Sequence, residues 1–329
     1  MEDKLSIVSF TDPACTWCWG SEPILRALET HFPGRFTIRN AMGGLMENFE
    51  ERWNPKDGPI DVEALNKRIG KGILKASERH GMPVCGENYH LVSHEFPSTF
   101  PSCIAYEAAK IIAPERADQF LYEMKLATCC EGRVTNDENV LANVAQEYGM
   151  DVEALLKAFH GEQANKMFED DMEFKDSIAV TVLPSFLLKY KDEQYLIRGY
   201  VDRDVFFDII DRTSHGELKP QPVEATTEAL VALMQHHPIM AAEEVRQAFD
   251  LSSQEEVASF VEPLLEDGTI HRKDAGNGWF VVLTDQVNSP QDLTDIDTTT
   301  YDDSSITTLD SNIYCNPETG VCTIPQRDV

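Results

Sequence analysis

Two cysteines separated by two residues, Cys15 and Cys18, form the segment of this sequence with the clearest chemical potential. A thiolate is the nucleophile in thiol–disulfide exchange, and a helix N-terminus with its free backbone N–H groups stabilises that thiolate. Two intervening residues place the second sulfur one helical turn away, where it can resolve a mixed disulfide. The spacing therefore predicts a redox pair in which Cys15 is the exposed attacking thiol and Cys18 is the shielded resolving thiol.

Strand-like and helical segments surround this cysteine pair. Residues 4–11 are rich in β-branched and aromatic residues, which predicts a strand, and Asp12-Pro13 ends it. Residues 18–31 have apolar positions at helical spacing, and residues 36–41 alternate as a second strand does. The chain is therefore predicted to begin β-α-β, with the cysteine pair at the first strand-to-helix junction.

A mostly helical stretch over about residues 58–177 interrupts this alternation of strands and helices. Strand character returns at residues 185–190 and 195–198, and a last helix follows. Pro184 directly precedes the first of these strands; because proline cannot donate a ladder hydrogen bond, it marks a strand start or a cis peptide bond. The predicted fold class of residues 1–218 is α/β, with a βαβ start and a ββα finish around a helical insert.

A proline-containing linker separates a smaller unit, residues 224–284, from the rest. Three helical segments and a hairpin pattern follow one another there, which is the element order of a winged-helix module. Its expected recognition helix, residues 252–268, has five acidic residues and no Lys or Arg. Because phosphate contacts need basic side chains, we expect this module to bind a protein partner and no nucleic acid.

The net charge of -29 is concentrated toward the C-terminal third of the 329-residue chain. Residues 220–285 carry twelve acidic and three basic residues, and residues 286–329 carry eight acidic residues and one basic residue. This balance argues against binding nucleic acid or an anionic membrane by charge. The sequence has neither an apolar run as long as a membrane span nor a secretory signal pattern. We therefore expect a cytoplasmic protein whose residues 285–329 form a flexible acidic tail.

Six further cysteines lie outside the Cys15–Cys18 pair. Four are predicted to be buried structural thiols, because free cysteine is among the most buried residue types. These four are Cys85, Cys103, Cys129 and Cys130. Cys315 and Cys322 lie in the polar tail and have two interpretations: a regulatory or resolving pair that reaches Cys15, or an adventitious or metal-scavenging pair. Their separation does not match a zinc knuckle, so neither a metal nor another cofactor is expected.

Several motifs together resemble those of one known family. They are FTDPACTWCWG (residues 10–20), RNAMGGL (residues 39–45), TVLPSF (residues 181–186) and IRGY (residues 197–200), with EGRVTNDENVLANVAQEYGMD in the helical insert. Their order resembles the DsbA-like branch of the thioredoxin superfamily over about residues 4–215. The first two motifs look most like the cytosolic members of that branch, which include FrnE-type dithiol-disulfide isomerases and YjbH (SpxH) adaptors.

The resemblance implies a thioredoxin-like fold with an inserted helical domain, in which a cis Pro184 packs against the cysteine pair and leaves the Leu183 backbone free to pair with a substrate. It implies a protein dithiol-disulfide oxidoreductase or isomerase that acts on protein or small-molecule disulfides. Its catalytic residues would be Cys15, Cys18 and Pro184, and its substrate groove would be lined by Trp17 and Leu183. The alternative is a protein-binding module, a protease adaptor that uses the same scaffold to present a client.

Overall fold

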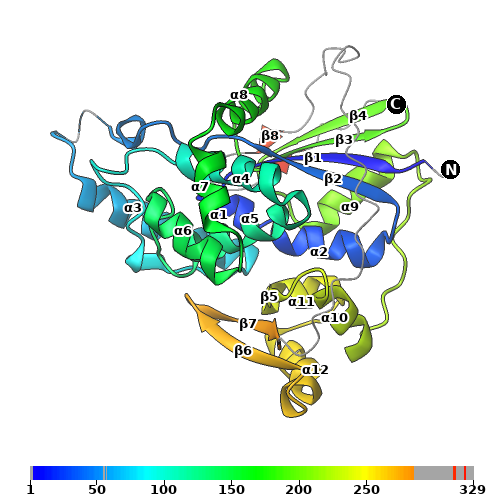
Figure 1. Cartoon of the computed structure of the whole chain (residues 1–329). Helices are drawn as coiled ribbons and strands as arrows, with labels where there is room; N and C mark the ends of the chain where they lie inside the picture. Colours follow the sequence, from blue (N-terminus) through cyan, green and yellow to red (C-terminus); the bar gives the residue numbers. More distant parts are fainter. Residues whose placement is uncertain (1–2, 55, 57, 285–313, 316–321, 324–329) are drawn as a thin grey trace.

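The computed structural model describes residues 3–54, 56, 58–284, 314–315 and 322–323. Most of these residues form two units that pack against each other. The N-terminal unit, up to residue 218, is built on a four-stranded sheet, and the C-terminal module, residues 224–284, contains a three-stranded sheet. In Figure 1 the module is coloured yellow to orange and lies below the larger unit.

The sheet of the N-terminal unit has the strand order β2-β1-β3-β4. Its strands are β1 (Leu5–Thr11), β2 (Phe36–Met42), β3 (Ser185–Tyr190) and β4 (Glu193–Arg198). β1 pairs parallel to β2 and antiparallel to β3, which pairs antiparallel to β4. The βαβ start and the ββ finish that the sequence predicts therefore meet in one sheet, with β1 and β3 at its centre.

Helices surround this sheet and form the insert between β2 and β3. They are α1 (Thr16–Trp19), α2 (Glu22–His31), α3 (Val62–His80), α4 (Phe100–Ile112), α5 (Pro114–Cys129), α6 (Glu138–Glu147), α7 (Val152–Phe159), α8 (Glu162–Ser177) and α9 (Arg203–Thr213), with the 3-10 helices η1 (Phe49–Arg52) and η3 (Gly86–Asn88). Helices α4 to α8 share a core of their own. The stretch 81–99 between α3 and α4 is not helical apart from η3, and we call its residues 82–92 the cover segment.

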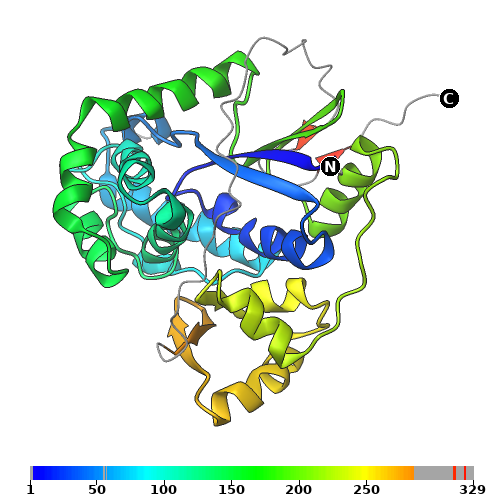
Figure 2. The ribbon, with the colours of Figure 1, turned by 45° about the vertical axis from the view of Figure 1, so that its right-hand side comes forward.

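Side chains of β1 alternate between the two faces of the sheet, as the two-residue period of a strand requires. Leu5 and Ile7 pack with α2 and α9 on one face. Val8 and Phe10 pack on the other face, where the Phe10 ring lies 5.4 Å from the ring of Phe174 in α8. The sheet is therefore buried on both faces. Figures 1 and 2 both show α2 between this sheet and the C-terminal module.

The C-terminal module has its own core and its own sheet of order β5-β7-β6. Its elements are α10 (Thr227–Met234), β5 (Ile239–Ala241), α11 (Ala242–Ala248), α12 (Gln254–Glu266), β6 (Ile270–Ala275) and β7 (Gly278–Leu283). Three helices and a hairpin occur here, with β5 between α10 and α11, and the winged-helix interpretation stays a prediction. The sequence did not reveal β5, because three residues are too few to show a strand period.

Side-chain caps fix where several helices begin. Asp61, Asp137, Asp151, Thr226 and Ser253 each accept a backbone N–H from the helical turn that follows. Each cap satisfies a donor that would otherwise lack an intrahelical partner, a contribution of about 0.5–2 kcal/mol. These caps are local in sequence, which is why the sequence pattern alone places α3, α6, α7, α10 and α12 well.

Within the predicted tail, the structure describes the backbone of two short strands, β8 (Tyr314–Cys315) and β9 (Cys322–Thr323). They pair antiparallel, and Cys315 is the register partner of Cys322. The rest of the predicted tail and the side chains of both cysteines lie outside the described residues. The predicted roles of Cys315 and Cys322 therefore stay predictions.

Candidate functional site

The cysteine pair lies where β1 leads into α1. Asp12 begins a turn in which its carboxylate accepts the Ala14 N–H at 2.8 Å and its backbone carbonyl accepts the Cys15 N–H at 3.1 Å. Cys15 caps α1, because its Sγ accepts the backbone N–H of Cys18 at 3.2 Å. Both cysteines are free thiols. Locally, this is the strand–turn–helix arrangement that the spacing predicts.

Both thiols are buried, contrary to the sequence-based expectation for Cys15. Cys15 is 3% exposed and Cys18 is 2% exposed, so the prediction of an exposed attacking thiol is wrong. Burial raises the pKa of the Cys15 thiol well above its ordinary value; the adjacent Cys18 side chain adds to the increase, and the Cys18 N–H offsets part of it. Because the thiolate is the reactive form, a covered and protonated thiol is a poor nucleophile.

Asp12 is a residue of this site that the sequence pattern did not reveal. Its buried carboxylate accepts four hydrogen bonds, and burial raises its pKa. The donors are Ala14 N (2.8 Å), Leu45 N (2.7 Å), Thr99 Oγ1 (3.1 Å) and Cys103 Sγ (3.2 Å). Asp12 therefore joins the motif loop to the loop after β2 and to the start of α4. An acidic residue directly after a buried strand was the available signal, because a buried carboxylate needs several donors.

Two other loops reach the same edge of the sheet. Beyond β2, the Gly43 N–H donates to the carbonyl of Thr11, the last residue of β1, at 2.7 Å. On the other side of β1, Phe10 pairs with Ser185, so Pro184 lies beside the end of β1. The peptide bond before Pro184 is cis, which is the geometry that the resemblance implied. Three of the motifs quoted from the sequence, those that contain Cys15, Gly43 and Pro184, therefore converge on one edge.

The two residues predicted to line a groove, Trp17 and Leu183, are half-buried. Leu183 packs so closely on Gly43 that a Cβ at that glycine would lie 2.6 Å from it. The Trp17 ring contacts the rings of His80 and Tyr200, with centroids 5.8 and 5.5 Å away. Burial lowers the pKa of His80 to about 3, so this imidazole is neutral at physiological pH. The roles of Trp17, Leu183 and Pro184 toward a ligand stay predictions.

The cover segment packs into the core beside the cysteine motif. Its apolar residues belong to the same buried core as Ala14, the residue before Cys15. Tyr89, near the middle of the segment, is 3% exposed. Burial raises the pKa of Tyr89, and the charges of neighbouring cysteine and aspartate groups, Cys15 among them, add to that increase. The phenol is therefore buried in the same core as Ala14.

Side chains of the N-terminal unit hold the cover segment at both ends. The Pro83 carbonyl accepts hydrogen bonds from Trp19 Nε1 and from Cys130 Sγ, each at 2.8 Å. At the other end, Asn66 of α3 donates to the Val92 carbonyl at 2.8 Å and accepts the Val92 N–H at 3.3 Å. The segment is thus fixed to α1, α3 and the end of α5.

The β6–β7 hairpin of the C-terminal module contacts the cover segment from the other side. In its turn, Asn277 Oδ1 accepts the Val84 N–H at 2.8 Å, and the Asn277 N–H donates to the Val84 carbonyl at 3.0 Å. Two glycines of the hairpin allow it to lie this close to the cover segment. A Cβ at Gly276 would lie 2.6 Å from the Val84 carbonyl oxygen, and one at Gly278 would lie 2.7 Å from Pro83.

Trp19 joins the cores of the two units. It is fully buried, and its ring lies 5.1 Å from that of Tyr122 in α5 and 6.3 Å from that of Phe280 in β7. Ile239 of β5 belongs to the same core. Of the two tryptophans beside Cys18, Trp19 therefore packs in the core between the units, whereas Trp17 is the one predicted to line a groove.

Buried charged side chains join α2 to α11. The guanidinium of Arg26 in α2 lies 2.9 Å from a carboxylate oxygen of Glu29, 3.6 Å from one of Glu22 and 3.7 Å from one of Glu244. Glu244 belongs to α11 and is fully buried, and it accepts a hydrogen bond from the Tyr122 hydroxyl at 2.5 Å. The Arg26 guanidinium is thus close to three glutamates, two in α2 and one in the C-terminal module.

This network shifts the pKa values of its members in opposite directions. Burial raises the pKa of Glu244 to about 8, although Arg26 lowers it. Burial also opposes the ionisation of Glu29, but the charges of Arg26 and His237 hold its pKa at about 2. Burial lowers the pKa of His237. These partners are about 200 residues apart in the chain, so no sequence pattern could have revealed their contact.

The other cysteines of the N-terminal unit are also free thiols, as expected for structural residues. Cys103, Cys129 and Cys130 are buried, and Cys85 is half-buried. The Cys85 N–H donates to the Cys129 carbonyl at 2.7 Å. Burial raises the pKa of Cys85 to about 11, so even this partly accessible thiol is protonated at physiological pH.

The surface predicted to meet a protein partner, within residues 224–284, has two different faces. The inner face, formed by α11 and the β6–β7 hairpin, packs against α2 and the cover segment. The outer face contains α12, whose glutamates are exposed. These are Glu255, Glu256, Glu262 and Glu266. The inner face is therefore covered by the N-terminal unit, whereas α12 is exposed to solvent.

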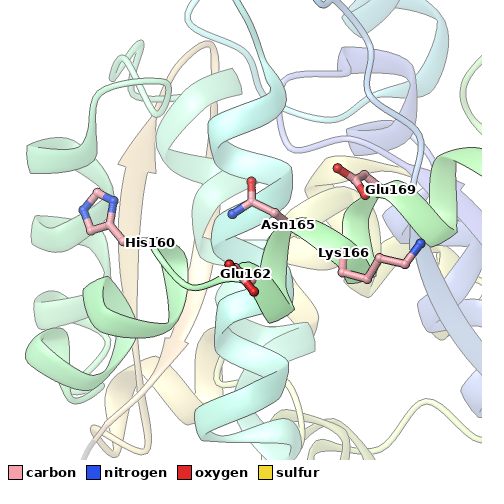
Figure 3. A pocket seen from close by; sticks show the side chains of 5 residues that line it. All are labelled: His160, Glu162, Asn165, Lys166 and Glu169. Carbon is pink, nitrogen blue, oxygen red and sulfur yellow. The ribbon is translucent and has the colours of Figure 1, made fainter.

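A polar hollow of about 450 Å³ lies far from the cysteine pair, at the junction of α7 and α8 (Figure 3). His160 and Lys166 line it, and both are exposed and bonded to neighbours: His160 to Glu138 at 3.0 Å and Lys166 to Asp170 at 2.7 Å. Within the described residues, no three His, Cys, Asp or Glu side chains are arranged to hold a metal ion. None of the described helices has the length and apolarity of a membrane span.

Comparison with known proteins identifies the scaffold. A family model described as Thioredoxin matches residues 8–207. Two solved structures share the fold: a candidate protein disulfide isomerase from Nitrosomonas europaea (TM-score 0.54, 17% identity, 66% of this chain and 100% of that one) and a probable DsbA oxidoreductase from Streptomyces coelicolor (TM-score 0.51, 18% identity, 67% and 94%). The predicted thioredoxin-like α/β fold and the DsbA-like resemblance are confirmed.

The relatives found by sequence similarity are named as adapter proteins and not as oxidoreductases. The chain is 26% identical over 284 residues to the ClpXP adapter protein SpxH of Bacillus subtilis (strain 168), covering 84% of this chain and 88% of that protein. It is also 26% identical over 251 residues to the ClpXP adapter protein SpxH of Shouchella clausii (strain KSM-K16), covering 76% and 79%. The prediction of a thiol-disulfide oxidoreductase or isomerase is therefore wrong. The motif shows the scaffold, whereas a covered thiol pair lacks the accessible thiolate that turnover needs.

Proposed function

The chain belongs to the thioredoxin family, and we propose that it uses this scaffold as a protease adaptor. Such an adaptor binds a client protein and presents it to a ClpXP-type protease. The observation that carries the proposal is the burial of both thiols of the motif, Cys15 and Cys18. A scaffold whose thiols are covered can still bind proteins through its surface. The similarity to SpxH adapters, which extends over most of both chains, supports the same function.

We further propose where the partner binds. The inner face of the C-terminal module is occupied by the N-terminal unit, whereas α12 presents acidic side chains to solvent. An acidic face is complementary to a basic surface on a client or on the protease, and such complementarity raises association rates and selects partners. As an adaptor for a bacterial protease, the protein would act in the cytoplasm.

Protein half-lives in cells test the proposal. Deleting the gene should lengthen the half-lives of a small set of proteins, and should have no further effect in cells that lack ClpX. A Cys15→Ser/Cys18→Ser variant should restore those half-lives as well as the wild-type chain does. Serine at position 15 keeps an oxygen acceptor for the Cys18 N–H, so the cap on α1 is preserved.

Cys103→Ser is the matched control, because Cys103 is a buried thiol outside the motif. If the deletion changed no half-life, or changed the same half-lives in cells without ClpX, the chain would not be an adaptor for this protease. If the wild-type chain and Cys103→Ser restored the half-lives but Cys15→Ser/Cys18→Ser did not, the thiols would take part and the scaffold interpretation would be wrong.

A further inference from the structure

Helix α3 is the most basic of the described helices. It contains five basic and two acidic residues, whereas the whole chain has 28 basic and 57 acidic residues. One face of α3 is buried through residues such as Leu65, Ile73 and Ala76. The opposite face is exposed and contains the basic side chains. Positive charge is therefore concentrated on one surface of a chain whose net charge is -29.

Three lysines on this exposed face form what we call the α3 stripe: Lys67, Lys71 and Lys75. They follow one another at intervals of four residues, so they lie along one side of the helix over about 12 Å. All three are exposed, and none of them forms an ion pair or a side-chain hydrogen bond with another described residue. Arg79, by contrast, pairs with Asp202. The ammonium groups of the α3 stripe are therefore available to another molecule.

Two features of the same face lower the stability of α3. Like charges four residues apart destabilise a helix, and the α3 stripe contains two such pairs. In addition, Gly72 is exposed in the helix interior, where glycine is less favourable than alanine. A Cβ at Gly70 would lie 2.5 Å from the Gly86 carbonyl oxygen, whereas one at Gly72 would meet no atom within 4 Å beyond the adjacent helix backbone. Packing within the chain therefore explains Gly70 but not Gly72.

The position of Gly72 indicates close approach by a partner. Gly72 follows Lys71 directly and lies one helical turn before Lys75, so it is adjacent to the α3 stripe. A glycine without a neighbour above it allows another chain to approach the helix backbone closely. The lysines and the glycine, which are both unfavourable for α3 alone, are then both favourable in a complex.

The charges around the α3 stripe indicate the chemistry of this partner. Lysine ammonium groups attract carboxylates, and acidic groups on a partner would be complementary to the stripe. Glu63 and Glu78 flank the stripe and limit it to about three helical turns. Such a short stripe makes few phosphate contacts, and the net charge of -29 repels a nucleic acid. A short acidic segment of a protein has less negative charge and matches the length of the stripe.

We propose that the α3 stripe and Gly72 form a docking site for a short acidic segment of a partner protein. The carboxylates of that segment pair with the three lysines, and its backbone lies over Gly72. This site belongs to the N-terminal unit and is separate from α12, whose exposed side chains have the opposite charge. The inference does not rest on the adaptor function.

Charge reversal in the full-length chain tests the proposal. Lys71→Glu/Lys75→Glu reverses the charge of the α3 stripe, and both side chains are exposed, so the fold should be kept. Lys4→Glu/Lys157→Glu is the matched control, because it changes the net charge equally at two exposed lysines outside the stripe. Circular dichroism checks that both variants are folded.

The probe is a fluorescein-labelled, alanine-rich peptide of about 17 residues, long enough to form a helix, with glutamate at every fourth position. A second peptide has glutamine at those positions. Fluorescence anisotropy at low salt measures both dissociation constants. The wild type and the control variant should bind the glutamate peptide roughly tenfold more tightly than the glutamine peptide, because several exposed ion pairs together amount to such a factor. Lys71→Glu/Lys75→Glu should lose this preference.

Gly72→Ala tests the close approach separately. Its urea midpoint of unfolding should rise, because alanine is the better helix former. Its affinity for the glutamate peptide should nevertheless fall by roughly threefold, because the added methyl group occupies the space above the helix. A residue with a merely structural role would not combine higher stability with weaker binding.

Several outcomes would overturn the proposal. They are a wild type that does not prefer the glutamate peptide, an equal loss of affinity in both charge-reversal variants, and a Gly72→Ala variant that is less stable or binds as tightly as the wild type. A DNA oligonucleotide of equal charge that bound more tightly than the peptide would assign the stripe to nucleic acid. Self-association of the wild type in sedimentation, abolished in Lys71→Glu/Lys75→Glu, would assign it to a second copy of the chain.

Discussion

Helices α11 and α12 of the C-terminal module are both acidic, but their carboxylates have different surroundings. In α11, Glu243 is bonded to Arg246 and Gln247, and Glu244 is fully buried beneath Tyr122. In α12, four glutamates are exposed to solvent. In α11, Glu244 joins the module to the N-terminal unit and Glu243 is bonded within the module, whereas α12 presents its glutamates to solvent.

This difference shows what net charge can and cannot indicate. The charge of residues 220–285 argues against nucleic-acid binding, because that argument depends only on the total sign. It does not say which carboxylates are available to a partner. Burial decides which carboxylates are available, since a buried carboxylate must accept hydrogen bonds or remain protonated. Stability should therefore depend on α11 and its partners, and association on α12.

The largest effect on stability is expected from removing the Arg26 guanidinium, which pairs with buried carboxylates. Arg26→Met should lower the free energy of unfolding by about 3–5 kcal/mol, because breaking a buried ion pair leaves uncompensated charge. Urea unfolding monitored by circular dichroism measures the change. Arg272→Met is the matched control: Arg272 is exposed and paired with Asp274, so its loss should cost at most about 1 kcal/mol. Equal costs would show that the α2–α11 contact contributes little.

The next largest effect is expected to be a pH dependence of the free energy of unfolding, which comes from Glu244. Its folded pKa of about 8 exceeds its ordinary value of 4.5, so the folded state holds a proton that the unfolded state releases between these pH values. The contribution of Glu244 to the free energy of unfolding is therefore greatest below pH 4.5. It falls as the pH rises toward 8, by up to about 1.4 kcal/mol per pH unit. Glu244→Gln, which cannot ionise, should remove this slope.

The test is the difference between wild-type and Glu244→Gln unfolding free energies from pH 5 to pH 8. Glu29 and His237 face the same network and titrate in both proteins, so much of their contribution cancels in the difference. A difference that does not change with pH would mean that Glu244 is ionised throughout, as a partner of Arg26.

A smaller effect is expected from a single hydrogen bond between the same helices. The Thr30 hydroxyl of α2 donates to the Ala248 carbonyl of α11 at 2.7 Å. Thr30→Val keeps the shape and removes the donor, and should lower the free energy of unfolding by about 1 kcal/mol. Urea unfolding again measures it, and Thr30→Ser, which keeps the hydroxyl, is the control. If Thr30→Ser cost as much as Thr30→Val, the methyl group would be responsible and not the hydrogen bond.

The smallest change in stability is expected on α12, where the effect on association should be largest. Glu262→Lys and Glu266→Lys should each change the free energy of unfolding by at most about 0.5 kcal/mol, because both side chains are exposed. In the half-life measurement described above, the double variant should restore client turnover less well than the wild type. Full restoration would exclude α12 from the partner surface.

Much of the fold could be predicted because its signals are local. β-branched and aromatic residues predict β1, and the order of the motifs predicts the insert; in the structure, local caps such as Asp151 and Ser253 then fix helix starts. The strand β5 was missed, because it is too short to show a period. The cover segment was missed because it has no regular structure, and its position is set by partners in α1, α3, α5 and the C-terminal hairpin.

The sequence by itself determined the scaffold and the position of Cys15 and Cys18 at a helix start, because those depend on short-range spacing and on backbone hydrogen bonding. Only the tertiary structure decided whether the thiols are accessible. Accessibility depends on the packing of residues from distant parts of the chain, and that packing leaves both thiols buried. Burial raises the pKa of Cys15, so the same motif that favours a reactive thiolate in isolation is a covered thiol here.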